Sequence, residues 1–266
     1  LVHFHTRFRG RQFYRSLARL PQPVLADLRD MLSDPAALAK CSNHLLCCAR
    51  GVARFAAAGG YPPEQTTMIP TTFTPPAPPP ETAVEAARNQ HNLGERPFLL
   101  FLGDVTKNKG VLELLTAFEK WQPHQPEVGL VLAGTNRLGR PFTDRVAQMP
   151  HTFFLGQIPH PQALALIQAA EMVLLPSRSE GLPSVILEAV ALGKKVLCPP
   201  QIAEFEAHLP EFVLPQVTVE AIYQAIQKIW HNPARPSYPL ENHLAANVVP
   251  HLVAVYNMLA AAKNLA

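Results

Sequence analysis

Two glutamates with seven residues between them, Glu180 and Glu188, enclose the turn Gly181-Leu182-Pro183. A strand-like apolar run, "MVLLPS" (172–177), precedes this turn, and a helix-like run, "PSVILEAVALG" (183–193), follows it. Ligands of open α/β sheets bind beyond the carboxyl ends of the strands. The two carboxylates are therefore expected where a ligand would bind.

The turn has the chemistry of an anion site. Pro183 suits the first turn of a helix, and the free N–H groups around Gly181 to Ser184 would face a phosphate. Glu188 lies one turn after Ser184 on the same helix face, where a carboxylate can bind the paired hydroxyls of a ribose. Glu180 can accept hydrogen bonds from sugar hydroxyls. Together these groups fit a nucleotide-sugar. The alternative is that both glutamates are ordinary solvated residues.

The elements that would position this turn alternate regularly from residue 96 onward. Helix-like segments separate strand-like runs over 97–103, 128–134, 152–156, 172–177, 194–200 and 211–215. Apolar strands alternating with helices predict a parallel sheet covered on both faces. The segment 1–70 shows the same alternation, with strands expected at 1–5, 23–27, 44–49 and 66–70.

A proline-rich stretch, "PTTFTPPAPPP" (70–80), separates the two series and behaves as a stiff extended spacer. We predict a partial N-terminal Rossmann-like domain over 1–73, whose first strands are missing, and a linker over 74–95. A donor-binding domain is expected over 96–232. A C-terminal helix within 233–266 is expected to pack back on the N-terminal domain.

The composition favours a soluble globular protein, with 48% hydrophobic and 16% charged residues in 266. The net charge of +3 is too small to indicate a nucleic-acid partner. Four cysteines without a CxxC pair suggest a reducing compartment. No membrane-spanning segment is expected, because no apolar run approaches about 20 residues. The arginines of 7–15 form either a solvated helix face or a contact with an anionic membrane.

The segment "LLPSRSEGLPSVILEAVALGKKVL" (174–197) resembles the signature of glycosyltransferase family 4, the group 1 retaining transferases. The E-x7-E motif of that family falls on Glu180 and Glu188. "FLLFLGDVTKNKGVLELLTAF" (98–118) resembles the opening of the family's donor domain, and residues 47–73 resemble the end of its N-terminal domain. The resemblance implies a GT-B fold: a doubly wound, parallel-sheet Rossmann-like donor domain plus the rear part of a second Rossmann-like domain.

The resemblance also implies roles for individual residues. Lys109 and Glu180 are the expected catalytic residues, with Lys109 stabilising the charge that builds up on the leaving diphosphate. Glu188 would bind the ribose, and the loop with Gln157 and Ile158 would meet the base. The full expected donor site comprises Gly103, Asp104, Lys109, Gln157, Ile158, Glu180, Gly181, Leu182, Pro183, Ser184 and Glu188.

Some positions depart from the family. Asp104 stands where relatives often have an arginine, so Asp104 turns away, Lys107 or Arg178 replaces the missing cation, or donor binding is weaker. Arg29 stands where many relatives have a histidine, and with His5 it is expected at the interdomain cleft. The pair His3 and His5 lacks a visible third ligand, so no metal site is predicted.

The resemblance implies a retaining, metal-independent glycosyltransferase that uses no cofactor. It would move a sugar from a UDP-, GDP- or ADP-linked donor to a glycan or lipid-linked acceptor in bacterial cell-surface polysaccharide synthesis. The expected location is the cytoplasm, with peripheral contact at the inner face of the membrane. One alternative is a non-catalytic or truncated nucleotide-sugar-binding subunit of a split transferase, whose partner chain supplies the missing strands. A sugar-nucleotide epimerase is a further alternative.

Overall fold

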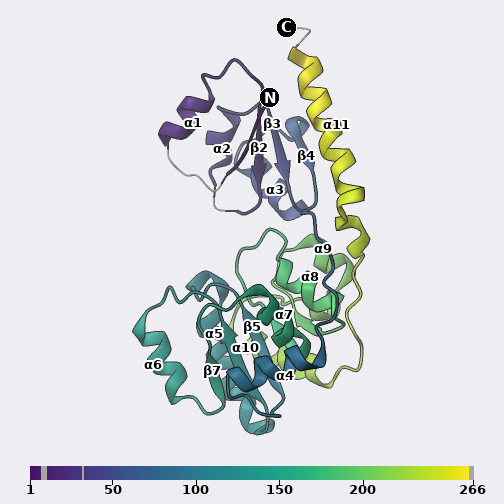
Figure 1. Ribbon diagram of the computed structural model, residues 1–266. Coiled ribbons are helices and arrows are strands. Elements are labelled where there is room, and N and C mark those ends of the chain that lie inside the picture. The colour runs from purple at the N-terminus through teal and green to yellow at the C-terminus, as the bar shows by residue number, and fades with distance from the viewer. Residues whose placement is uncertain (7–10, 32, 264–266) are drawn as a thin grey trace.

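The computed structural model describes residues 1–6, 11–31 and 33–263 and places them in two lobes, each built on one parallel sheet (Figure 1). The N-lobe is the upper one in Figure 1 and contains the sheet of order β1-β2-β3-β4. The C-lobe contains the sheet of order β7-β6-β5-β8-β9. The predicted α/β fold with two parallel sheets is confirmed.

The N-lobe alternates strands and helices along the chain. Its elements are β1 (Val2–His5), α1 (Arg11–Leu17), β2 (Val24–Leu28), α2 (Pro35–Ala39), β3 (His44–Cys47), α3 (Arg50–Ala58) and β4 (Thr66–Met68). Arg7 and Arg9 of the expected basic segment lie outside the described residues. Every residue of β2 and β3 is buried, as expected for central strands of a parallel sheet that is covered on both faces.

The C-lobe continues the same alternation after the proline-rich stretch. Its strands are β5 (Phe98–Leu102), β6 (Gly129–Ala133), β7 (Thr152–Phe154), β8 (Met172–Leu174) and β9 (Lys195–Leu197). Its helices are α4 (Glu81–Gln90), α5 (Val111–Trp121), α6 (Arg140–Gln148), α7 (His160–Ala169), α8 (Ser184–Ala191), α9 (Ala203–His208) and α10 (Val219–His231). β5 and β8 are hydrogen-bonded neighbours, with Leu99 opposite Met172. The loops that follow these two strands therefore leave the sheet side by side.

The strand predicted over 211–215 does not form. Pro210–Phe212 is a short 3-10 helix, and a single bridge pairs Val213 with Cys198. Two apolar residues of this segment, Phe212 and Leu214, are nevertheless buried in the C-lobe core. A short apolar run indicates burial, but its conformation depends on whether a neighbouring strand edge is available.

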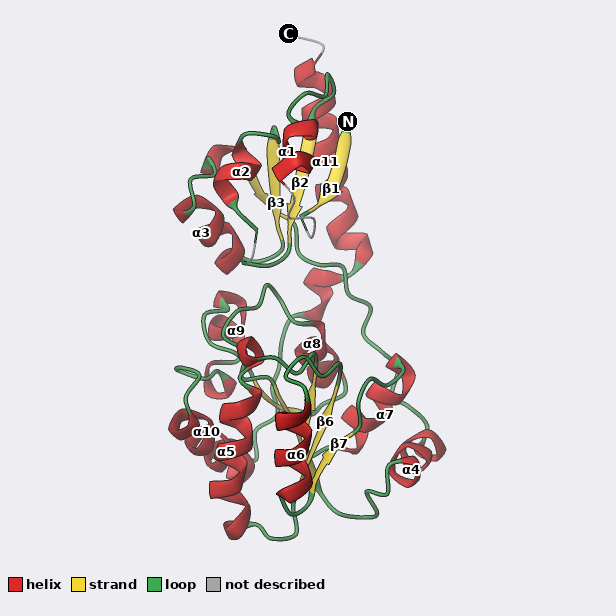
Figure 2. Cartoon of the chain, turned by 90° about the vertical axis from the view of Figure 1, so that its left-hand side faces the viewer, coloured by secondary structure: helices red, strands yellow, loops and turns green. Residues whose placement is uncertain are grey.

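The C-terminal helix α11 (Ala245–Lys263) returns from the C-lobe and runs along the N-lobe sheet (Figure 2). Its residues Val248, Val255 and Leu259 pack on Leu25 and Leu46 of β2 and β3.

Residues 245–262 have a mean hydropathy of 1.3 and are long and apolar enough to cross a membrane by length and composition alone. The expectation that the chain has no such run was therefore wrong. Only 17% of this stretch is buried inside the protein.

Candidate functional site

The centre of the site is an ion pair between two loops of the C-lobe. Lys109 ends a 3-10 turn (Lys107–Lys109) after β5, and Glu180 lies in the loop between β8 and α8. Lys109 Nζ donates a hydrogen bond to Glu180 Oε1, although 71 residues separate the two in the sequence. The side chains are 26% and 12% exposed, so solvent still reaches the pair. The pair follows from the adjacency of β5 and β8, because both loops emerge at the carboxyl edge of neighbouring strands.

Arg178 ties these two loops together. Its backbone N–H donates to Asn108 O at 2.8 Å, and its guanidinium donates to Lys107 O and to Glu113 Oε1, each at 2.8 Å. The Arg178 side chain is thus held against the loop and the start of α5. The hypothesis that Arg178 takes the place of the missing family arginine is not favoured by this geometry, since the guanidinium is already paired with Glu113.

Gly103 and Asp104 directly follow β5. The Asp104 carboxylate faces Arg137, whose Nε lies 3.8 Å from Asp104 Oδ2, and both side chains are at least half exposed. Asp104 is thus oriented toward a cation on the loop after β6. This orientation agrees with the first of the three explanations for the missing arginine, in which Asp104 turns away.

The sequence predicts an anion site at the start of α8. The helix begins at Ser184, which is exposed, after the half-buried residues Leu182 and Pro183. Pro183 is the N-cap and has no polar side chain. Its carbonyl accepts from the Ile186 N–H at 3.2 Å, and the amides of Ser184 and Val185 have no side-chain cap. These N–H groups and the positive end of the helix dipole are available to an anionic group.

Glu188 lies one turn further along α8 and contacts a residue that the sequence did not single out. His160 Nε2 lies 3.0 Å from Glu188 Oε1. The Glu188 side chain is 14% exposed, whereas that of His160 is 66% exposed. His160 is the first residue of α7, directly after the loop that carries the exposed Gln157 and the half-buried Ile158. The predicted base-binding loop and the predicted ribose-binding acid are therefore joined through His160.

The turn at Gly181 also contacts the N-lobe. A Cβ atom on Gly181 would lie 2.2 Å from Arg29 O and 2.9 Å from Cys48 Sγ. Leu182 packs against the hydrophobic cores of both lobes. A second link joins the lobes, since the Arg50 N–H at the start of α3 donates to Glu204 Oε1 at 2.7 Å. The loop that carries Glu180 therefore lies between the lobes, and Gly181 is required there for close approach.

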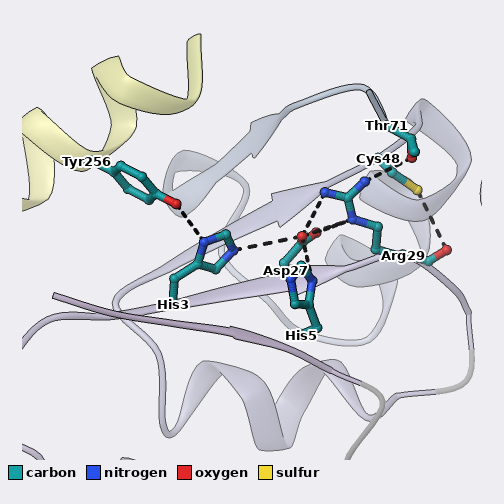
Figure 3. A network of polar contacts seen from close by, with 7 residues as sticks. All are labelled: His3, His5, Asp27, Arg29, Cys48, Thr71 and Tyr256. Atoms are coloured by element: carbon teal, nitrogen blue, oxygen red, sulfur yellow. Dashed lines mark hydrogen bonds and ion pairs between the residues drawn. The ribbon is translucent and has the colours of Figure 1, made fainter. Parts of the chain in front are cut away.

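A polar network centred on Asp27 lies on the N-lobe side (Figure 3). Asp27 is 1% exposed and accepts hydrogen bonds from the Arg29 guanidinium at 2.8–2.9 Å. Arg29 also donates to Thr71 Oγ1, and His5 Nδ1 lies 2.9 Å from Asp27 Oδ2. The His5 ring is 65% exposed at the carboxyl end of β1. Arg29 is thus oriented by Asp27, while the far side of the His5 ring faces solvent.

His3 belongs to the same network. Its Nδ1 lies 2.7 Å from the Tyr256 hydroxyl of α11, and its Nε2 lies 3.8 Å from Asp27 Oδ2. Burial lowers the pKa of His3, against the opposing effect of Asp27.

His3, His5 and Asp27 bring three potential metal-ligand atoms within 4.8 Å of one another. Sequence spacing does not indicate Asp27 as a third ligand, because parallel pairing of β1 with β2 is what places it beside the histidines. The Arg29 guanidinium already balances the charge of this carboxylate and would repel a cation bound beside it.

Comparison with known proteins assigns the family. The model of the glycosyl transferases group 1 matches residues 83–247, which is more than half of the chain. The chain therefore belongs to the group 1 glycosyltransferases.

Curated relatives resemble parts of the chain. A putative teichuronic acid biosynthesis glycosyltransferase of Bacillus subtilis is 34% identical over 37% of this chain and 23% of its own length. The alpha-D-kanosaminyltransferase of Streptomyces kanamyceticus is 25% identical over 67% of this chain and 47% of its own length. The matched part of the chain thus spans less than half the length of either relative.

Solved structures share the fold. Anabaena HepE, solved in complex with UDP and glucose, matches 97% of this chain and 78% of its own with a TM-score of 0.75 and 16% identity. Sucrose-phosphate synthase of Thermosynechococcus elongatus matches 98% of this chain and 73% of its own, with a TM-score of 0.75 and 19% identity. The fold is that of the GT-B glycosyltransferases.

Proposed function

We propose that this chain performs the sugar-transfer chemistry of a retaining glycosyltransferase with a nucleotide-sugar donor. The observation that carries the proposal is the Lys109–Glu180 pair, placed beside the amide-rich start of α8 at the carboxyl edge of the C-lobe sheet. This arrangement offers a cation, free N–H groups and a carboxylate to one ligand. A nucleoside diphosphate linked to a sugar has the complementary groups.

Lys109 is the residue proposed to stabilise the leaving diphosphate. Its ammonium group donates a hydrogen bond to Glu180, which orients the cation toward the site. As the bond to the sugar breaks, negative charge builds up on the diphosphate and attracts both Lys109 and the first amides of α8. We propose that these groups do the work for which other transferases use a divalent cation, so that activity persists in the presence of a chelator.

Glu188 is proposed to bind the ribose hydroxyls, and the loop with Gln157 and Ile158 is proposed to meet the base. The helical spacing supports this division, because Glu188 lies one turn behind the amides that would hold the phosphates. The carboxylate is 14% exposed and can accept from two hydroxyl groups at once.

The sugar would lie between the lobes, against the turn Glu180–Leu182 and across from Arg29 and His5. No side-chain nucleophile is proposed: the acceptor would attack from the face that the diphosphate leaves, and a diphosphate oxygen would take the acceptor's proton. The C1–oxygen bond to the diphosphate breaks as the C1–oxygen bond to the acceptor forms, with retention at C1.

The proposed acceptor is a glycan or lipid-linked glycan of bacterial cell-surface polysaccharide synthesis, met at the inner face of the membrane. Large apolar side chains exposed on α11 and the adjacent β4 support a peripheral membrane contact: Val249, Val253, Met258 and Met68 are 44–47% exposed. Co-sedimentation with phospholipid vesicles tests this part. Retention by the vesicles that is lost in the V253S/M258S double variant is expected, whereas equal retention of both proteins contradicts it.

Calorimetric titration with UDP, GDP and ADP tests the donor site. We expect one of the three to bind, and Glu188→Gln to weaken that binding by about tenfold, because the charge-assisted hydrogen bonds to the ribose are lost. The matched control is Glu220→Gln, since Glu220 of α10 forms an exposed ion pair with Lys120 of α5. Equal nucleotide affinity in wild type and Glu188→Gln would contradict the ribose assignment. Binding without sugar transfer would instead favour a non-catalytic subunit.

A further inference from the structure

The contact between His160 and Glu188 points to a residue beyond those expected from the family signature. His160 is the first residue of α7, and Glu188 lies on α8, which packs beside α7 (Figure 1). The two side chains meet with 3.0 Å between His160 Nε2 and Glu188 Oε1, although 28 residues separate them in the sequence. The contact therefore arises only from the packing of the two helices.

We propose that His160 is a positioning residue that holds the Glu188 carboxylate ready for the hydroxyls of a pentose. The inference rests on the proposed function of the same site. In this role His160 Nε2–H donates to Glu188 Oε1 and does not itself react with the substrate.

The geometry leaves the carboxylate able to bind a ligand while His160 holds it. Each carboxylate oxygen has two lone pairs, so Oε1 can accept from His160 and from a ribose hydroxyl together, and Oε2 remains for the second hydroxyl. Glu188 is 14% exposed, whereas the imidazole of His160 is 66% exposed and forms the solvent side of the contact.

The physical effect is preorganisation. A free glutamate populates several rotamers and loses that freedom when it binds a ligand, which weakens binding. A hydrogen bond made on folding fixes the rotamer beforehand. His160 is itself fixed at its backbone, because it follows Pro159 and precedes Pro161, whose rings restrict the main chain at the start of α7. The loop with Gln157 and Ile158 leads directly into this position, so His160 also links the expected base and pentose contacts.

The test compares a nucleotide with its analogue lacking the pentose diol. The probes are the nucleoside diphosphate among UDP, GDP and ADP that binds best and its 2′,3′-dideoxy form, titrated by calorimetry into wild type, His160→Ala, His160→Gln and His231→Ala. His231 is the matched control, because its ring contacts Gln227 on α10.

We expect His160→Ala to weaken binding of the ribonucleotide about three- to tenfold, the loss of one such hydrogen bond, and to change binding of the dideoxy form less than about twofold. His160→Gln, which can still donate, should recover part of the loss, and His231→Ala should have no effect.

Several outcomes would overturn the inference. An equal loss for both probes would mean that His160 only supports the fold of the loop. Unchanged or tighter binding of the ribonucleotide to His160→Ala would mean that the histidine is irrelevant or competes with the pentose. If Glu188→Gln weakens binding and His160→Ala does not, the donor site stands and the positioning role fails. If none of the three nucleotides binds wild type, the proposed function and this inference both fail.

Discussion

Gly110 allows the two loops that carry Lys109 and Glu180 to approach each other, and its replacement by alanine should separate them. Its φ is +67°, a left-handed conformation that costs a residue with a side chain about 1–2 kcal/mol. A Cβ atom would also lie 2.1 Å from Pro176 O and 2.8 Å from Val217 Cγ1, where ordinary contact is 3.4–4 Å. Pro176 O is a backbone atom, so rotation of a side chain cannot relieve the clash.

The cost of the clash can be separated from the cost of φ by a matched glycine. Gly193 has a φ of +68°, and a Cβ there would meet nothing within 4 Å. Gly193→Ala should therefore lower the free energy of unfolding by the conformational cost alone, about 1–2 kcal/mol. Gly110→Ala adds an overpacking cost of about 1–3 kcal/mol. The difference corresponds to roughly 2–12 °C in Tm for a chain of this size.

Urea unfolding followed by circular dichroism measures both variants, and calorimetry with the bound nucleotide measures the site. Gly110→Ala should be the less stable variant and should also bind nucleotide more weakly, since separating the loops moves Lys109 away from Glu180. Gly193→Ala should keep wild-type affinity. If the two variants lose the same stability within about 0.5 kcal/mol and bind nucleotide equally, close packing at Gly110 does not position the site.

Two further changes follow from contacts described above. Arg178→Ala removes the hydrogen bonds to Lys107 O and Glu113, so nucleotide affinity should fall about five- to tenfold. Arg145→Ala, which removes hydrogen bonds to Thr116 and Glu119, should leave the affinity unchanged. Equal effects of the two variants in calorimetry would contradict the conclusion that Arg178 ties the two loops together. Burial lowers the pKa of His44 in the folded chain below its ordinary value of 6.5, so the folded state resists its protonation. The contribution of neutral His44 to the free energy of unfolding is therefore complete above pH 6.5. It is lost as the pH falls from 6.5 toward the lowered pKa that His44 has in the folded state. The His44→Gln variant, which can still bond to Thr67, should show a smaller decrease in the free energy of unfolding between pH 7 and pH 5 than wild type. An equal decrease in both proteins would show that protonation of His44 does not cause this loss of stability.

The alternation of apolar runs and helical patterns was sufficient to predict the two parallel sheets. Strands such as β5 and β6 are nearly all apolar because helices cover both faces of the sheet, and that pattern is visible in sequence. The strand predicted over 211–215 does not form, because a short apolar run indicates burial without deciding between a strand and another conformation. The segment 245–262 does not stand out as one apolar run because alanines, asparagines and a histidine interrupt its larger apolar side chains.

The sequence by itself determined which backbone amides and acidic side chains lie together at the start of α8. The spacing of Gly181, Pro183, Ser184 and Glu188 places amides and an acid on one end and one face of α8, because a helix has a fixed period. Tertiary structure decided the partners of these groups: Lys109 with Glu180, His160 with Glu188, and Arg29 with Asp27 beside His5. Apart from the local Asp27–Arg29 pair, these contacts join residues far apart in the chain. Lys109 meets Glu180, and His5 meets Asp27, because parallel crossovers bring the carboxyl ends of neighbouring strands to one edge of a sheet. His160 meets Glu188 because α7 packs beside α8. Which side chains then meet depends on strand order and on the approach of the two lobes at Gly181, and neither is encoded in the spacing of nearby residues.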